Sequence, residues 1–164
     1  MDVTKRMAPA RAESDSTERV VVVGVDGSKA SSEALVWAAE EARLRGATLR
    51  VVHAWSLPML NSAEYVPAEV IEEAPAAAEE SLAAQVTDVL GSSPEIGMEH
   101  EVRQGPPARV ILEAARDAEL VVVGSRGRGG FSGLLLGSVS AQVAHHAACP
   151  VTIVRQARQV PGRE

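Results

Sequence analysis

The chain has 164 residues, one cysteine and a formal net charge of −6 at neutral pH. This length is typical of one domain with a single core that needs neither disulfides nor a structural metal. The negative charge and an aromatic content of only 2% argue against binding to nucleic acid or to an anionic membrane surface. The chain has no apolar leader and no long uncharged apolar stretch, so we expect a cytoplasmic protein without a membrane span.

The two ends of the chain differ in composition from the part between them. Residues 1–17 mix proline, serine, alanine and charges of both signs without periodicity, which predicts a disordered N-terminal tail. We expect the folded domain to cover residues 18–156 and a short C-terminal tail to cover residues 157–164.

Between these ends, apolar runs rich in β-branched residues alternate with segments of helical periodicity. Strands are expected at residues 19–25, 48–54, 96–103, 119–123 and 150–155. Helices are expected at residues 29–45, from near Pro75 to Gly91, at 107–118 and at 137–147, with a long connection over 55–74. Such alternation predicts an α/β fold with an open, five-stranded parallel sheet and helices on both faces.

The loop after the fourth predicted strand is rich in glycine, with the spacing Gly124-x2-Gly127-x9-Gly137-Ser138. Its backbone N–H groups, the hydroxyls of Ser138 and Ser140, and the N-terminus of the following helix would together form a site for phosphate. The alternative is a flexible lid whose glycines serve mobility alone.

This spacing resembles the nucleotide-binding motif of the ATP-binding branch of the universal stress protein family. Further similarities lie in Val20–Ser28, Val52–Ala54 and Ala148–Arg155, and the resemblance covers about residues 18–156. It implies a Rossmann-like sheet, related to the adenine-nucleotide α-hydrolase fold, with strand order 3-2-1-4-5. In that order the ligand lies outside the carboxyl ends of strands one and four.

The resemblance also implies roles for individual residues. Gly24, Asp26, Ala54, Val123 and Gly124 would surround the adenine and ribose, with Asp26 and the backbone near Ala54 reading the base. Arg126 would lie near the phosphates, which Gly127, Gly137, Ser138, Val139 and Ser140 would hold. Asp26 has an alternative role, because an acidic residue just after a strand can simply cap a turn or a helix.

The expected ligand is ATP, arriving with Mg²⁺ that the phosphates and water would coordinate, since the sequence contains no evident protein cage for a metal. We expect a nucleotide-dependent regulatory module of the stress response, and at most weak ATP hydrolysis, because no recognisable general base accompanies the motif. A slow ATPase or autophosphorylating protein is one alternative, with Ser138 or Ser140 as the acceptor. A phosphorelay receiver is another, but it needs an acidic pair after the first strand, where Asp26 stands alone.

The last predicted strand, Val151–Val154, contains neither charge nor proline and would lie at a sheet edge. Such an edge is a ready surface for pairing with a second copy, so we expect a symmetric homodimer. A dimeric scaffold that binds no nucleotide is the remaining alternative.

Overall fold

The computed structural model describes residues 18–56, 67–92, 94–129 and 135–155. The strands are β1 (Val20–Val25), β2 (Thr48–Trp55), β3 (Met98–Gln104), β4 (Leu120–Gly124) and β5 (Val151–Val154). They form one parallel sheet in the order β3-β2-β1-β4-β5, which confirms the predicted fold class and strand order. Both predicted tails, residues 1–17 and 157–164, lie outside the described residues.

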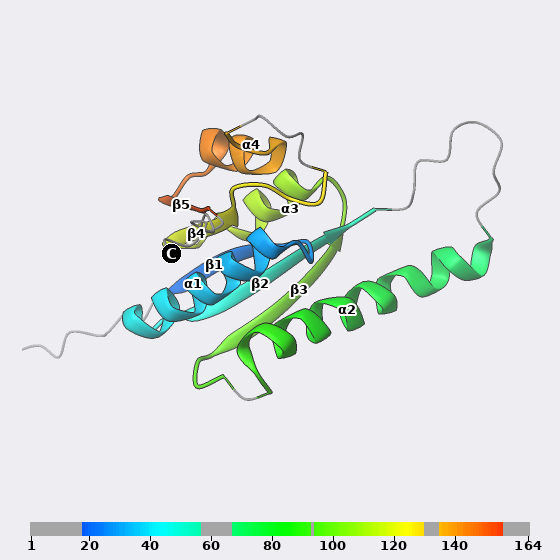
Figure 1. Cartoon of the computed structure of the whole chain (residues 1–164), viewed down its shortest axis with the longest axis horizontal. Coiled ribbons are helices and arrows are strands. Elements are labelled where there is room, and N and C mark those ends of the chain that lie inside the picture. The colour runs from blue at the N-terminus through cyan, green and yellow to red at the C-terminus, as the bar shows by residue number, and fades with distance from the viewer. Residues whose placement is uncertain (1–17, 57–66, 93, 130–134, 156–164) are drawn as a thin grey trace, which may run out of the picture.

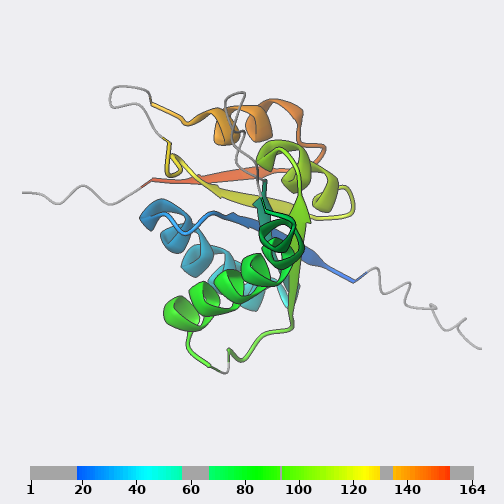
Figure 2. The ribbon, with the colours of Figure 1, turned by 90° about the vertical axis from the view of Figure 1, so that its right-hand side faces the viewer.

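Helices cover both faces of the sheet, as Figure 2 shows with the sheet nearly edge-on. Helices α1 (Lys29–Arg45) and α2 (Ala68–Leu90) lie on one face, and α3 (Pro107–Ala114) and α4 (Ser138–His146) lie on the other (Figure 1). Alternate residues of β1 serve the two layers: Val21 and Val23 pack in the core below α1, whereas Val20 and Val22 pack with α3 and α4. A strand buried on both faces is therefore apolar throughout, which explains the unbroken valine run.

Helix α1 has the limits that the sequence predicts. Its N-cap is Ser28, whose side chain accepts a hydrogen bond from the backbone N–H of Ser31. Its C-cap is Gly46, in the left-handed conformation at φ 61° that glycine adopts without strain. This capping fixes where the chain leaves β1 and re-enters the sheet at β2.

The prediction for α2 was wrong at its N-terminus. The helix begins at Ala68, directly after Pro67, and Pro75 lies inside it rather than in its first turn. Proline at that position cannot donate to the carbonyl of Ile71, but both residues are exposed, so water can satisfy the carbonyl. Of the predicted long connection, residues 57–66 lie outside the described residues.

Helix α3 ends at Ala114, four residues earlier than predicted. The guanidinium of Arg50 donates a hydrogen bond to the Ala114 carbonyl over 2.9 Å and forms an ion pair with Asp117. The guanidinium from β2 thus caps α3 at Ala114, although the helical periodicity of the sequence continues to residue 118. The other boundaries differ from prediction by one or two residues, the usual uncertainty at element ends.

The two edge strands differ. Apolar and charged residues alternate over residues 96–103, which predicts a strand with one wetter face. Strand β3 has such a surface, but His100, which the alternation places on the apolar face, is exposed. Strand β5 is half-buried along its whole length. Within the part of the chain that the structure describes, no helix is long and apolar enough to cross a membrane.

Candidate functional site

A cavity of about 540 Å³ opens at the carboxyl ends of β1, β2 and β4. This volume is within the usual range for small-molecule sites. The cavity lies where the strand order reverses, because β1 is followed in the sheet by β2 on one side and by β4 on the other. Open α/β sheets place their ligands at such a switch point.

The structure brings every residue of the predicted site to this one cavity. The lining includes Gly24, Asp26, Ala54, Val123, Gly124, Arg126, Gly127, Gly137, Ser138, Val139 and Ser140. It also includes Arg128, which together with Arg126 gives the glycine-rich loop the positive charge that a phosphate site needs. Residues that the sequence did not indicate line the cavity as well, among them Ser31, Val52, His53, Trp55, Pro107 and Ile111. Residues 130–134 of the glycine-rich loop lie outside the described residues.

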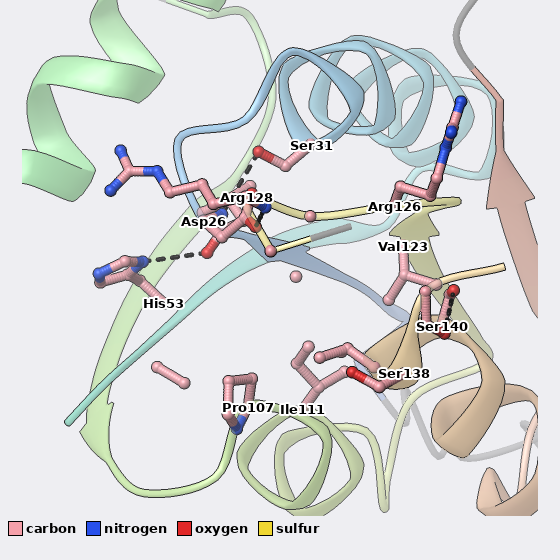
Figure 3. Close-up of a pocket in the computed structure, with 18 of the residues that line it drawn as sticks. Asp26, Ser31, His53, Pro107, Ile111, Val123, Arg126, Arg128, Ser138 and Ser140 are labelled. Carbon is pink, nitrogen blue, oxygen red and sulfur yellow. Dashed lines mark hydrogen bonds between the residues drawn. The ribbon is translucent and has the colours of Figure 1, made fainter. Parts of the chain in front are cut away.

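Asp26, at the end of β1, joins the two loops that meet here (Figure 3). One carboxylate oxygen accepts the backbone N–H of Ser28 over 3.0 Å, and the other accepts the backbone N–H of Arg128 over 3.1 Å. Burial raises the pKa of Asp26, but hydrogen bonds from Ser28, Arg128 and Ser31 outweigh it, and the net pKa is lowered. The Asp26 carboxylate is therefore ionised, and it both caps its own turn and binds the backbone of the glycine-rich loop.

Two glycines make this contact possible. A Cβ atom on Gly127 would collide with the Asp26 carboxylate, and a Cβ atom on Gly27 would collide with the guanidinium of Arg128. Gly27 also has a φ of +78°, a conformation that favours glycine. The Asp26 carboxylate thus lies against Gly127, and the Arg128 guanidinium lies against Gly27, so each loop has a glycine where a charged side chain of the other loop packs.

The start of α4 borders the opposite side of the cavity. Among the described residues no side chain caps this helix. Ser138 and Val139 line the cavity, and the backbone N–H groups of this first turn have no partner within the helix. The N–H of Gly137, however, donates to the Ser125 carbonyl over 2.7 Å. Of the groups predicted to hold phosphate here, the Gly137 N–H is therefore already engaged.

The Ser140 hydroxyl is likewise turned into the protein. Its side chain is 2% exposed, and its hydroxyl lies 3.0 Å from the carbonyls of both Ser125 and Gly137, to which it can donate. In this arrangement Ser140 fixes the glycine-rich loop to the first turn of α4. The Ser138 side chain is exposed at the cavity (Figure 3).

The wall of the cavity is apolar around the strand ends. Gly24 allows Ile111 of α3 to pack directly on β1, because a Cβ atom there would collide with the end of that side chain. Val52, Val123 and Pro107 extend this apolar surface. One signal in the sequence points to the α3 residues: a helix that begins right after β3 also begins at the carboxyl edge of the sheet.

A histidine within a predicted strand, as His53 is, is more often packed or exposed than part of a site, but in the structure His53 lines the cavity. Its Nδ1 atom lies 3.0 Å from the Val25 carbonyl, so Nδ1 carries the proton that is donated. The imidazole thereby links the ends of β1 and β2 beside Asp26.

The positive charge at the cavity comes from the glycine-rich loop. Within the described ranges, neither Arg126 nor Arg128 has a carboxylate within 4.0 Å, whereas Arg43, Arg45 and Arg50 are ion-paired. The two guanidinium groups extend in different directions from the loop in Figure 3. No cluster of three or more metal-ligating side chains occurs among the residues that the structure describes.

Comparison with known proteins agrees with this architecture. The model of the universal stress protein family matches residues 18–155. A universal stress protein of Mycolicibacterium smegmatis is 40% identical over 136 residues, covering 82% of this chain and 45% of that protein. The chain thus spans about half the length of the curated relatives it matches.

Solved structures of similar proteins contain adenine nucleotides. The universal stress protein from Archaeoglobus fulgidus in complex with dAMP is 28% identical with a TM-score of 0.57, covering 84% of this chain and 98% of that one. A universal stress protein in complex with cAMP is 30% identical with a TM-score of 0.54, covering 85% and 98%. Sequence, fold and family match agree, and the chain belongs to the universal stress protein family.

Proposed function

We propose that the cavity binds an adenine nucleotide, with ATP and Mg²⁺ as the expected form, and that occupancy regulates the protein in a stress response. The observation that carries this proposal is the convergence of Asp26, the glycine-rich loop and the N-terminus of α4 on one cavity. Each of these features suits a different part of a nucleotide. The dAMP and cAMP complexes of the two similar proteins support the same ligand class.

The strand ends suit the base. Ile111, Val52 and Val123 offer an apolar surface to a planar ring, and Asp26 is held as an anion beside it. A carboxylate only accepts hydrogen bonds, so an Asp26 carboxylate that faces position 6 of the purine favours the amine of adenine over the carbonyl that guanine and hypoxanthine carry there. Gly24 lets Ile111 form part of this surface, and the small side chain of Ala54 leaves room for the base and the ribose.

The start of α4 suits the phosphates. Its N–H groups at Ser138 and Val139, together with the helix dipole, attract an anion, and the arginines of the loop add positive charge. Mg²⁺ would neutralise phosphate charge and take its remaining ligands from water. Ser140 would act indirectly, by holding Gly137 and Ser125 in place.

The acid and the histidine of the cavity favour binding over rapid turnover. Asp26 is bonded to two backbone N–H groups, and the Nδ1 atom of His53 is bonded to the Val25 carbonyl. These hydrogen bonds hold both side chains in structural contacts rather than leaving them available for proton transfer.

We also propose that two copies pair along β5. This strand forms one edge of the sheet and contains neither charge nor proline. Its outer backbone groups are suited to continue the ladder into a second copy.

Calorimetric titration with ATP and with GTP, each with Mg²⁺, tests the nucleotide proposal. Mass spectrometry of any nucleotide that is retained through purification identifies the natural ligand. We expect saturable ATP binding and at least about tenfold weaker GTP binding, because the Asp26 carboxylate would face a carbonyl. Absence of ATP binding to the folded protein would contradict the proposal and favour the dimeric scaffold.

A further inference from the structure

Behind Asp26 lies a buried serine hydroxyl whose hydrogen-bonding capacity is fully used. Ser31 lies in the first turn of α1 and is 4% exposed. Its Oγ accepts the backbone N–H of Asp26 over 3.3 Å and the side-chain amide of Gln85 over 3.1 Å, and it donates to the Ser28 carbonyl over 2.9 Å. One donor and two acceptors are all that a hydroxyl offers.

Gln85 brings a second helix into this arrangement. It is half-buried on α2, which packs on α1 and β3, and its amide also lies 3.4 Å from the Ser32 Oγ. Polar contacts therefore run without a break from α2 through Ser31 to Asp26, and from Asp26 to the N–H of Arg128 in the glycine-rich loop. Figure 3 shows the part of this series that runs from Ser31 through Asp26 to Arg128.

The geometry points to Ser31 and Gln85 as positioning residues for Asp26, which set how strictly the cavity selects adenine over bases that present a carbonyl. This inference rests on the proposed nucleotide function, and it adds residues that act on the base through Asp26. Ser31 fixes the backbone at the point where β1 ends and the turn begins. The direction of that backbone determines whether the Asp26 carboxylate reaches the Ser28 and Arg128 N–H groups together.

The charge state of Asp26 depends on the same contacts. Burial raises its pKa, and the hydrogen bonds of Ser28, Arg128 and Ser31 lower it further than burial raises it. The other ionisable groups that line the cavity are the guanidinium groups of Arg126 and Arg128 and the imidazole of His53, and all three are unchanged in the variants described below. Because the Ser31 proton goes to the Ser28 carbonyl, Ser31 acts on the carboxylate through the backbone that it holds. Loss of its hydroxyl should loosen the hydrogen bonds from the Ser28 and Arg128 N–H groups and so raise the pKa of Asp26, whether or not a nucleotide is present.

The test uses Ser31→Ala, Gln85→Ala and the double variant in the full chain. Ser32→Ala is the matched control, because Ser32 is the next residue, bonds to the same Ser28 carbonyl and lies near Gln85, but has no bond to Asp26. Two quantities are measured: the pKa of the Asp26 carboxyl by NMR without ligand, and the ratio of the dissociation constants for inosine triphosphate and ATP. A merely structural role would weaken both nucleotides alike and leave this ratio unchanged.

We expect Ser31→Ala to raise the pKa of Asp26 and to lower the selectivity ratio about fivefold, which is the worth of one hydrogen bond. Gln85→Ala should change both quantities in the same direction but by less. In the Ser31→Ala background it should have no further effect, because Gln85 acts through the Ser31 hydroxyl. Ser32→Ala should leave both quantities unchanged.

An unchanged Asp26 pKa in both single variants would overturn the inference, and so would an equal effect of Ser32→Ala. If the wild type binds no nucleotide, the proposed function fails, but the pKa measurement still decides whether Ser31 and Gln85 position Asp26. If Ser31→Ala fails to fold, Gln85→Ala carries the same two measurements.

Discussion

The turn after β1 and the glycine-rich loop after β4 meet through two residue pairs. The Asp26 carboxylate lies over Gly127 and accepts the N–H of the next residue, and the Arg128 guanidinium lies over Gly27. These contacts hold the two loops together across the mouth of the cavity. The site therefore depends on the missing side chains of Gly27 and Gly127 as much as on the side chains of Asp26 and Arg128.

Because of Asp26, the free energy of unfolding should decrease at acid pH. Because hydrogen bonds outweigh burial, its folded-state pKa lies below the ordinary value of 3.8. Its contribution to stability is therefore present above the ordinary pKa and is lost as the pH falls through the folded-state pKa. Denaturant unfolding between about pH 7 and about pH 3 should show Asp26→Asn less stable at neutral pH and less sensitive to acid.

The control for this experiment is Asp88→Asn, at an exposed position on α2. It should leave the pH dependence of the wild type intact. A pH profile of Asp26→Asn that parallels the wild type would show that the carboxylate contributes no such linkage.

At the scale of elements, β4 approaches α1 more closely than a side chain allows. A Cβ atom on Gly124 would lie 2.8 Å from the backbone carbon and 2.9 Å from the carbonyl oxygen of Ala30. Backbone cannot yield as a side chain can, so Gly124→Ala should lower the free energy of unfolding by about 2–3 kcal/mol. Urea unfolding measures this loss.

Gly24→Ala is the matched comparison, because its Cβ atom meets the flexible end of Ile111 rather than backbone. We expect a clearly smaller loss of stability for this variant. Equal losses at the two positions would contradict the close approach of β4 to α1.

The elements that the sequence predicted well are those with local signals. Ser28 and Gly46 cap α1 by contacts within a few residues, and the valine run of β1 can belong only to a strand buried on both faces. The start of α2 was missed because Pro67 and Pro75 are both plausible first-turn residues. The early end of α3 was missed because Arg50, from a distant strand, caps it.

The site residues that could be predicted are likewise those with a local signal in the sequence. Gly127 and Ser138 belong to a contiguous motif, and the parallel topology then brings Asp26 to them. Ser31 and Ile111 could not be found in this way, because they reach the cavity from helix faces whose rotation depends on packing. The inward turn of the Ser140 hydroxyl likewise depends on the position of the Ser125 carbonyl.

At the scale of the whole molecule, the β5 edge is the expected surface for a second copy. Thr152→Glu would place like charges near each other in a two-fold β5 pair, because the strand meets its own counterpart. Sedimentation should show dimers for the wild type and monomers for this variant. Val36→Glu, on the exposed face of α1, adds the same charge away from the edge and should remain dimeric.

A wild type that sediments as a monomer at high micromolar concentration, with and without ATP, would contradict pairing along β5. A dimer that Thr152→Glu leaves intact would place the interface elsewhere.

The central claim is that this cavity binds an adenine nucleotide, and the most direct test is calorimetric titration of ATP with Mg²⁺ into the wild type, Gly127→Ala and Gly129→Ala. The two variants add the same methyl group to one loop, but at Gly127 it meets the Asp26 carboxylate, whereas at Gly129 no atom of the described residues lies within 4 Å. We expect at least about tenfold weaker binding for Gly127→Ala and wild-type affinity for Gly129→Ala, in folded proteins. Equal affinity in all three proteins, or no binding by the wild type, would contradict it.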